Sequence, residues 1–333
     1  MTVEKKKSKN RLKKVLLWTI AVIVLIVGAL TILDMTASPV GKWRTSAGQE
    51  AYESAYQEIL KSMPAFEESY DIPTDYGTVR AYRWSNPDTE DKTPIVLFPG
   101  RTTGVPMWSQ NIPDLIKERP VYALDAIGDS GMSVQTKKIA TDADQAKWMD
   151  QTLEGLKIQK AHIVGHSIGG WLAMNYATTY PDRVQSLSLF EPIRTFTDMH
   201  LSIYISSIPA ALPFLPQSWG DNFLKEVSGE PQLDPNDPTT RMISAATNDF
   251  ALTLPFPGMI TQEALQSLPM PVYVAMGTKS SMHDSKKALE VARQNIHTLD
   301  AQEWPEGTHS LPMENPSQIN ASLLKFIDKS EMK

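Results

Sequence analysis

The sequence predicts an α/β protein whose mostly parallel sheet is flanked by helices. Three observations support this. Short apolar runs alternate with helical segments over residues 74–192 and again after residue 270, as in sheets whose crossovers are helices. A G-x-S-x-G sequence stands between one such run and one such helix. Residues 193–270 are rich in Pro, Met, Leu, Phe and Ile and carry little strand signal, which indicates an inserted helical cap because ordinary loops are much shorter.

The expected elements follow in chain order. A helix from Gly48 to Met63 is expected within a connector over residues 34–73. The main domain is expected over 74–333, with one helix from about Asp142 to Leu156 and another over Trp171 to Ala177. The expected strands are 78–84, 94–98, 120–125, 161–164, 184–190, 271–276 and 301–304. Loops that follow the carboxyl ends of parallel strands meet at one edge, so we expect the site there.

Composition excludes several classes of site. The chain has no cysteine, which rules out disulfides, thiolate metal sites and a cysteine nucleophile. Its six histidines show no metal-binding spacing, and Asp125 with Asp129 lacks a third ligand, so neither a metal nor another cofactor is expected. The net charge is −6, but residues 1–14 hold seven basic residues against one acidic residue. The remaining chain is therefore acidic, which argues against a nucleic-acid partner.

The N-terminus predicts a membrane anchor. Val15 to Leu33 is an uncharged apolar run of about 19 residues, or about 28 Å as a helix, enough to cross a bilayer core. The basic residues 1–14 precede it, so we expect a cytoplasmic tail and an extracytoplasmic body at the cell membrane. The alternative is a cleaved signal peptide. The run exceeds the usual apolar region of such peptides, and Met35 to Ser38 is a poor cleavage site.

The stretch Gly165-His166-Ser167-Ile168-Gly169 is the most informative in the chain. It lies between an expected strand and an expected helix, where a sharp turn exposes the corner side chain and requires small neighbours. This setting predicts Ser167 as a nucleophile. The alternative is a glycine-rich turn that carries an ordinary surface serine.

A serine hydroxyl needs a base to remove its proton. His309 follows the last expected strand directly, where a strand-end loop would bring it to the same edge as Ser167. The other histidines fit less well, including His283 in the loop after the penultimate strand. His309 is therefore the predicted base, with a solvated loop histidine as the alternative.

Several segments together resemble the α/β-hydrolase fold family across roughly residues 74–328. They are Gly165 to Gly170, Phe98 to Arg101, Asp125 to Gly131, and Gly307 to His309. The resemblance implies acyl transfer to water through a serine ester. It also implies an oxyanion hole formed by the backbone N–H groups of Ile168 and Arg101. The chain departs from the family at Pro99, which replaces the usual histidine.

The resemblance leaves the acid of the triad open. Many relatives place an aspartate where this chain has Ser280, and a serine cannot orient the base or stabilise its imidazolium. Glu191, at the end of the strand after the elbow helix, is the favoured replacement because some relatives draw the acid from there. Asp284 is the alternative acid, although it also stands where a helix N-cap would be expected.

The expected function is a membrane-anchored serine hydrolase of the carboxylesterase or lipase kind, acting on a small-molecule carboxylic ester or related acyl compound. Two alternatives stay open. One is a non-catalytic binding protein that keeps the fold, suggested by Ser280. The other is cofactor-free haloperoxidase-like chemistry, which would use the same triad.

Overall fold

The computed structural model describes residues 13–15, 17–19, 21–26, 28, 38–211, 217–230 and 232–332. The chain divides into two compact units, residues 1–39 and 40–333. In the first unit the described residues from 13 to 28 are helical. The remainder of the expected tail (1–14) and of the expected anchor (15–33) lies outside the described residues. Among the residues described, no helix is both long enough and apolar enough to cross a membrane.

The second unit is built on a sheet with the order β11-β10-β8-β7-β4-β5-β3-β2 in the described residues, with β6 beside β3. The strands from β11 to β5 run parallel, whereas β3 and β2 are antiparallel at one edge. A separate short ladder joins β1 to β9. The strands are β1 (Lys42–Trp43), β2 (Glu68–Thr74), β3 (Gly77–Trp84), β4 (Ile95–Phe98), β5 (Val121–Leu124), β6 (Val134–Gln135), β7 (Ala161–His166), β8 (Val184–Phe190), β9 (Phe250–Ala251), β10 (Val272–Gly277) and β11 (Leu299–Trp304).

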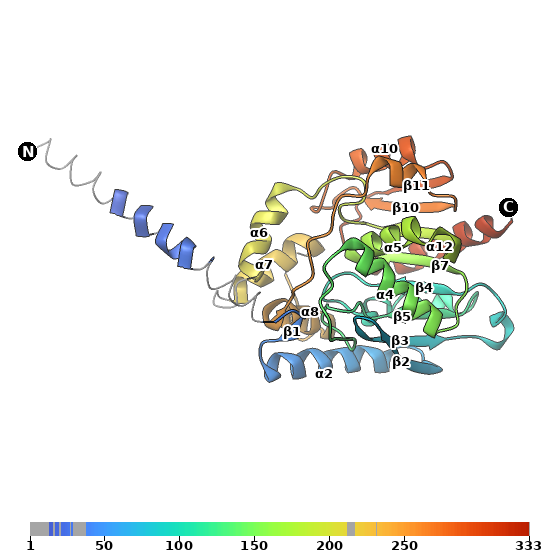
Figure 1. The fold of residues 1–333 in the computed structure, drawn as a ribbon, viewed down its shortest axis with the longest axis horizontal. Helices are drawn as coiled ribbons and strands as arrows, with labels where there is room; N and C mark the ends of the chain where they lie inside the picture. Colours follow the sequence, from blue (N-terminus) through green and yellow to red (C-terminus); the bar gives the residue numbers. More distant parts are fainter. Residues whose placement is uncertain are drawn as a thin grey trace, which may run out of the picture. The chain divides into compact units, whose positions relative to one another are not determined.

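Helices cover both faces of this sheet (Figure 1). They are α2 (Ser46–Ser62), α3 (Ile112–Leu115), α4 (Asp142–Gly155), α5 (Ile168–Thr179), α6 (Leu201–Ala211), α7 (Gln217–Ser228), α8 (Pro238–Asp249), α9 (Gln262–Gln266), α10 (Ser285–Asn295), α11 (Leu311–Glu314) and α12 (Pro316–Glu331). Three single 3-10 turns, Pro87–Thr89, Val105–Trp108 and Pro181–Arg183, complete the regular structure of the described chain.

The alternation of side chains along β4 explains the two layers. Val96 and Phe98 pack with side chains of α4, α5 and α10, whereas Ile95 and Leu97 pack with side chains of α2, α3 and α12. Successive side chains of a strand point to opposite faces, and both faces here are apolar. Such a strand is stable only where helices cover both sides. The expected α/β class with a mostly parallel, helix-flanked sheet is therefore confirmed.

The N-terminal part of the second unit differs from its expected role as a connector. Strand β2, which was not expected, pairs with β3 at the sheet edge. Helix α2 packs against α8, within the expected cap segment 193–270. The compact unit thus begins near Val40 rather than near residue 74. The alternating pattern of β2 is weak because its side chains are largely exposed, which explains why the sequence did not indicate it.

Helix α2 also reaches the carboxyl edge of the sheet through Tyr56. Its hydroxyl donates to Asp125 Oδ2 at 3.0 Å, and both side chains are fully buried. Burial raises the pKa of Asp125 to about 6, although hydrogen bonds from Met132, Val105 and Tyr56 oppose that rise. At neutral pH the carboxylate is therefore charged, and it depends on these donors for stabilisation.

We expect Tyr56→Phe to lower the free energy of unfolding by about 1–3 kcal/mol at pH 7.5, because a buried carboxylate loses a donor. Urea titration followed by circular dichroism measures this change. Tyr70→Phe is the matched control, since its hydroxyl bonds to exposed Glu68 and such surface contacts contribute little, about 0.5 kcal/mol. Equal effects for the two variants would contradict the role given to Tyr56.

Candidate active site

Ser167 stands at the turn between β7 and α5. Its backbone has φ 56° and ψ −120°, a conformation that costs energy for a residue with a side chain. The flanking glycines allow the turn. A Cβ on Gly165 would lie 2.2 Å from the Gly169 carbonyl oxygen, and a Cβ on Gly169 would lie 2.4 Å from the Phe98 carbonyl oxygen. The G-x-S-x-G spacing is thus required by the close approach of β7, α5 and β4.

His309 lies within hydrogen-bond distance of Ser167. Its Nε2 is 2.8 Å from Ser167 Oγ, and its side chain is almost fully buried. The loop that carries His309 follows β11 and is held from two directions. Thr308 Oγ1 donates to the Ser228 carbonyl at the end of α7, and His166 Nε2 lies 2.7 Å from the His309 carbonyl oxygen. The structure therefore brings the two predicted side chains together.

His166 can make that contact only as a donor, because a carbonyl oxygen only accepts. Burial, with a smaller contribution from His309, lowers the pKa of His166 to about 3. The ring is therefore neutral, with its proton on Nε2. The uncharged His166 ring thus links the turn at Ser167 to the loop of His309 through one hydrogen bond.

Glu191 lies on the other side of His309. Its Oε2 is 3.2 Å from His309 Nδ1, and the side chain is fully buried. It follows β8, which neighbours β7 and β10 in the sheet. The Gly277 N–H donates to its Oε1 at 2.5 Å, and the Ser280 hydroxyl donates to its Oε2. Ser167, His309 and Glu191 thus form one continuous chain of hydrogen-bond contacts.

Two opposing effects act on the pKa of Glu191. Burial alone would raise it, but the neighbouring His283 and then His309 lower it by more than burial raises it. The pKa of Glu191 consequently lies well below its usual range. An ionised carboxylate beside Nδ1 keeps the proton of neutral His309 on that atom and leaves Nε2 free to accept the serine proton.

The structure separates the two candidate acids. Asp284 is exposed, and its Oδ1 accepts the Lys287 N–H at 3.0 Å as the N-cap of α10. Ser280 occupies the position where relatives were expected to have an aspartate, and it points its hydroxyl at Glu191 instead. His283 was considered only as a possible base, yet its Nε2 lies 3.3 Å from Glu191 Oε2. Sequence reasoning missed both as partners of the acid.

The expected oxyanion donors lie beside Ser167. Ile168 is the first residue of α5. Arg101 follows Gly100, at which a Cβ would lie 3.6 Å from Ser167 Cβ. Asp129, which is buried, steadies this loop because it accepts the Thr102 N–H at 3.3 Å and lies 3.8 Å from the Arg101 guanidinium. Backbone donation from Arg101 does not depend on the side chain of residue 99, so Pro99 is compatible with it.

Asp125 supports the same loop from the other end. Its Oδ1 accepts the Val105 N–H at 2.8 Å, and its Oδ2 accepts the Met132 N–H at 2.7 Å. Asp125 and Asp129 therefore both accept hydrogen bonds from backbone N–H groups of these loops. In the part of the chain that the structure describes, no three His, Asp or Glu side chains are arranged to hold a metal ion.

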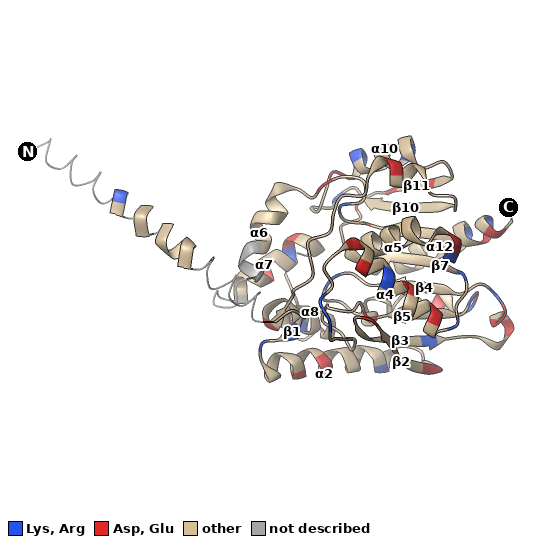
Figure 2. Cartoon of the chain, viewed as in Figure 1, with Lys and Arg blue, Asp and Glu red and all other residues tan. Residues whose placement is uncertain are grey.

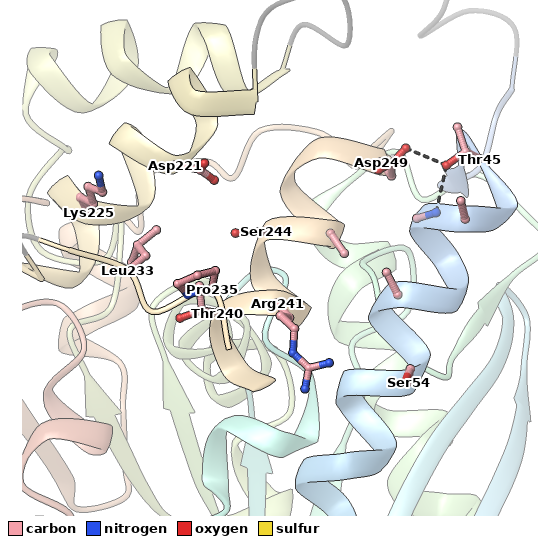
Figure 3. A pocket seen from close by; sticks show the side chains of 14 residues that line it. Thr45, Ser54, Asp221, Lys225, Leu233, Pro235, Thr240, Arg241, Ser244 and Asp249 are labelled. Atoms are coloured by element: carbon pink, nitrogen blue, oxygen red, sulfur yellow. Dashed lines mark hydrogen bonds between the residues drawn. The ribbon is translucent and has the colours of Figure 1, made fainter. Parts of the chain in front are cut away.

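A cavity of about 580 Å³ lies between α2, α7 and α8 (Figure 3). Its lining includes small and hydroxyl-bearing side chains together with Asp221, Lys225 and Arg241. Ser167, His309 and Glu191 do not line it. The last turn of α7 lies next to the triad loops, because Ser281 Oγ donates to the Glu226 carbonyl there. Helix α7 thus contacts both the cavity and the loops that carry the predicted triad.

Comparison with known proteins agrees with this fold. A model of the alpha/beta hydrolase fold matches residues 93–245, which include Ser167 and Glu191. The uncharacterized carboxylesterase nap of Bacillus subtilis (strain 168) is 28% identical over 83% of this chain and 92% of its own length. Carboxylesterase YbfK of the same organism is 26% identical over 83% of this chain and 93% of its own length.

A solved structure gives the same result. Naproxen esterase (carboxylesterase NP) from Bacillus subtilis superposes with a TM-score of 0.77 at 26% identity, covering 85% of this chain and 99% of that chain. The chain therefore has the α/β-hydrolase fold, and the proteins that resemble it over most of their length are named carboxylesterases.

We expect Glu191→Gln to lower kcat for a p-nitrophenyl ester by about 10⁴, the usual loss when the acid of a triad is neutralised. Asp284→Asn is the matched control and should leave kcat unchanged, because asparagine also caps a helix. Stopped assays on both variants, with melting temperatures as a folding check, measure the difference. A crippled Asp284→Asn beside an active Glu191→Gln would reverse the assignment.

Proposed function

We propose that this α/β-hydrolase-fold protein is a serine carboxylesterase with Ser167 as nucleophile, His309 as base and Glu191 as acid. The single observation that carries the proposal is the contact chain from Ser167 Oγ to His309 Nε2 and from His309 Nδ1 to Glu191. The resemblance to named carboxylesterases over most of the chain supports the same reaction class.

The proposed reaction has two halves. His309 Nε2 takes the proton of Ser167 as Oγ attacks the ester carbonyl, and Glu191 stabilises the imidazolium. The oxygen that becomes negative accepts the N–H groups of Ile168 and Arg101. The tetrahedral intermediate expels the alcohol, which receives the proton from His309 and leaves the acyl group on Ser167. Water then attacks this ester, activated by His309 in the same way, and the carboxylic acid is released.

The non-catalytic alternative drew its support from the serine at position 280. Glu191 weakens that support, because it supplies a buried carboxylate to His309 from the neighbouring strand β8. A binding protein would have no need of an ionised acid, a base and a nucleophile in contact. We therefore favour the enzyme, with a small-molecule acyl ester as substrate.

We further propose that residues 15–33 anchor the protein in the cell membrane with the catalytic unit outside. Lys13 and Lys14 precede the run, and its described part carries no charged residue (Figure 2). The large apolar side chains that are described in it are exposed to solvent, an arrangement that favours burial in lipid or against a partner. They are Val15, Leu17, Trp18, Val22, Ile23, Val24, Leu25 and Ile26.

A fluorophosphonate probe tests the enzyme proposal, because it reacts with a serine only when a base activates it. We expect stoichiometric labelling of the wild-type chain and none of Ser167→Ala, read by intact-protein mass spectrometry. Ser130→Ala is a matched control, since Ser130 is also buried. Failure of the wild type to react, or equal labelling of Ser167→Ala, would refute the enzyme.

Fractionation of cells that express the full chain tests the anchor separately. We expect a protein of full-length mass that resists extraction by sodium carbonate and dissolves in detergent, because the apolar run stays in the bilayer. External protease should digest residues 40–333 in cells whose membrane is intact. A product that starts near Ser38 in the medium would identify a cleaved signal peptide instead.

A further inference from the structure

The loop after β10 directs two side chains at the acid of the proposed triad. The Ser280 hydroxyl donates a hydrogen bond to Glu191 Oε2. His283 Nε2 lies 3.3 Å from the same oxygen, and about 1% of the side chain is exposed. This buried nitrogen has no hydrogen-bond partner within the described chain. The Gly277 N–H, at the end of β10, donates to Oε1. The segment that was expected to carry an aspartate therefore surrounds the carboxylate of the neighbouring strand with donors.

Glu191 needs such donors because it is fully buried. An ionised carboxylate removed from water is stable only when it is paired or hydrogen-bonded. Each of its oxygens offers about two lone-pair directions. Oε2 faces three groups, namely Ser280 Oγ, His309 Nδ1 at 3.2 Å and His283 Nε2 at 3.3 Å. The Ser280 and His309 contacts meet hydrogen-bond geometry, whereas His283 Nε2 approaches the same oxygen without a hydrogen bond of its own.

We propose that His283 is a positioning residue that competes with His309 for Glu191 Oε2 through its Nε2–H group, and thereby limits how strongly this acid holds the base His309. The inference rests on the proposed serine-hydrolase function. Ser280 acts in the same sense, as a second donor to the same oxygen. Neither residue touches the Ser167 hydroxyl in the described contacts, so both act through Glu191.

The other titratable group near this cluster does not compete for Glu191. Within the described chain, Glu191 and His309 are faced by His283 from the loop after β10, by each other, and by His166 from the end of β7. The neutral His166 ring donates a hydrogen bond from Nε2 to the His309 carbonyl oxygen. The stabilisation of the His309 imidazolium therefore depends on Glu191 and on the groups that share its oxygens.

The direction of the effect follows from this sharing. An N–H group that approaches Oε2 draws on its charge and so weakens the stabilisation of the His309 imidazolium. Removal of His283 returns that charge to His309 and raises its pKa. His309 then becomes a free base only at higher pH, and the acid limb of kcat/KM moves upward in pH.

The test compares His283→Leu with His283→Gln in the full-length chain, kept in a mild detergent. Glutamine keeps an N–H donor near the position of Nε2, whereas leucine has none. We expect the acid limb of kcat/KM for a p-nitrophenyl ester to rise by about 0.5–1 pH unit in His283→Leu, a shift typical of one altered hydrogen bond to a charged group. His283→Gln should retain the wild-type limb. An unchanged or lowered limb in His283→Leu, or equal shifts in both variants, would overturn the proposal.

A second measurement separates this inference from the proposed function. Nuclear magnetic resonance titration of the His309 ring reads its pKa without turnover, so it applies even if no ester is hydrolysed. A raised His309 pKa in His283→Leu supports the inference, whereas inertness of the wild type towards the fluorophosphonate probe counts against the enzyme alone. If His283→Leu fails to fold, Ser280→Ala deletes a single oxygen and should shift the pKa of His309 in the same direction. An unchanged value in that variant would equally refute the proposal.

Discussion

The stabilisation of one buried carboxylate, that of Glu191, is the constraint on which the geometry of the site depends. A charge with no exposed surface must be surrounded by donors, and here they come from the end of β10 and from the loops after β10 and β11. Parallel pairing sets β8, β10 and β11 side by side, so these loops leave the sheet at one edge. The same donors keep Glu191 ionised and fix the side of His309 that faces it. Its opposite nitrogen is thereby directed at Ser167.

A second set of buried acids organises the other half of the site. Asp129 accepts the Thr102 N–H within the Gly100–Gly104 loop, and Asp125 accepts the Val105 N–H just after it. This loop carries an expected oxyanion donor. Tyr56 links Asp125 to helix α2. The segment before the sheet is thus more than a connector, because it stabilises the charge that holds this loop. Three buried carboxylates, each with its own donors, thus position the loops around Ser167.

The expected cap segment, residues 193–270, contacts the loops of the proposed triad through α7. The last turn of α7 accepts hydrogen bonds from Ser281 and Thr308, which stand in the loops of His283 and His309. Asp221 and Lys225 of α7 line the cavity that α2 and α8 complete. A shift of α7 would therefore displace the two loops that carry His283 and His309, since packed elements transmit small displacements.

The sequence alone determined the α/β class, the turn at Ser167 and the loop of His309. These features are encoded in contiguous residues, because a strand, a sharp turn with small neighbours and a helix form one local pattern. The sequence left Glu191 and Asp284 as alternative acids, and it did not indicate that Ser280 or His283 would contact the acid. Those outcomes depend on which strands become neighbours, a non-local property of the sheet. Only the tertiary structure, by setting β8 beside β10, brought the Glu191 carboxylate to His309 and left Asp284 to cap a helix.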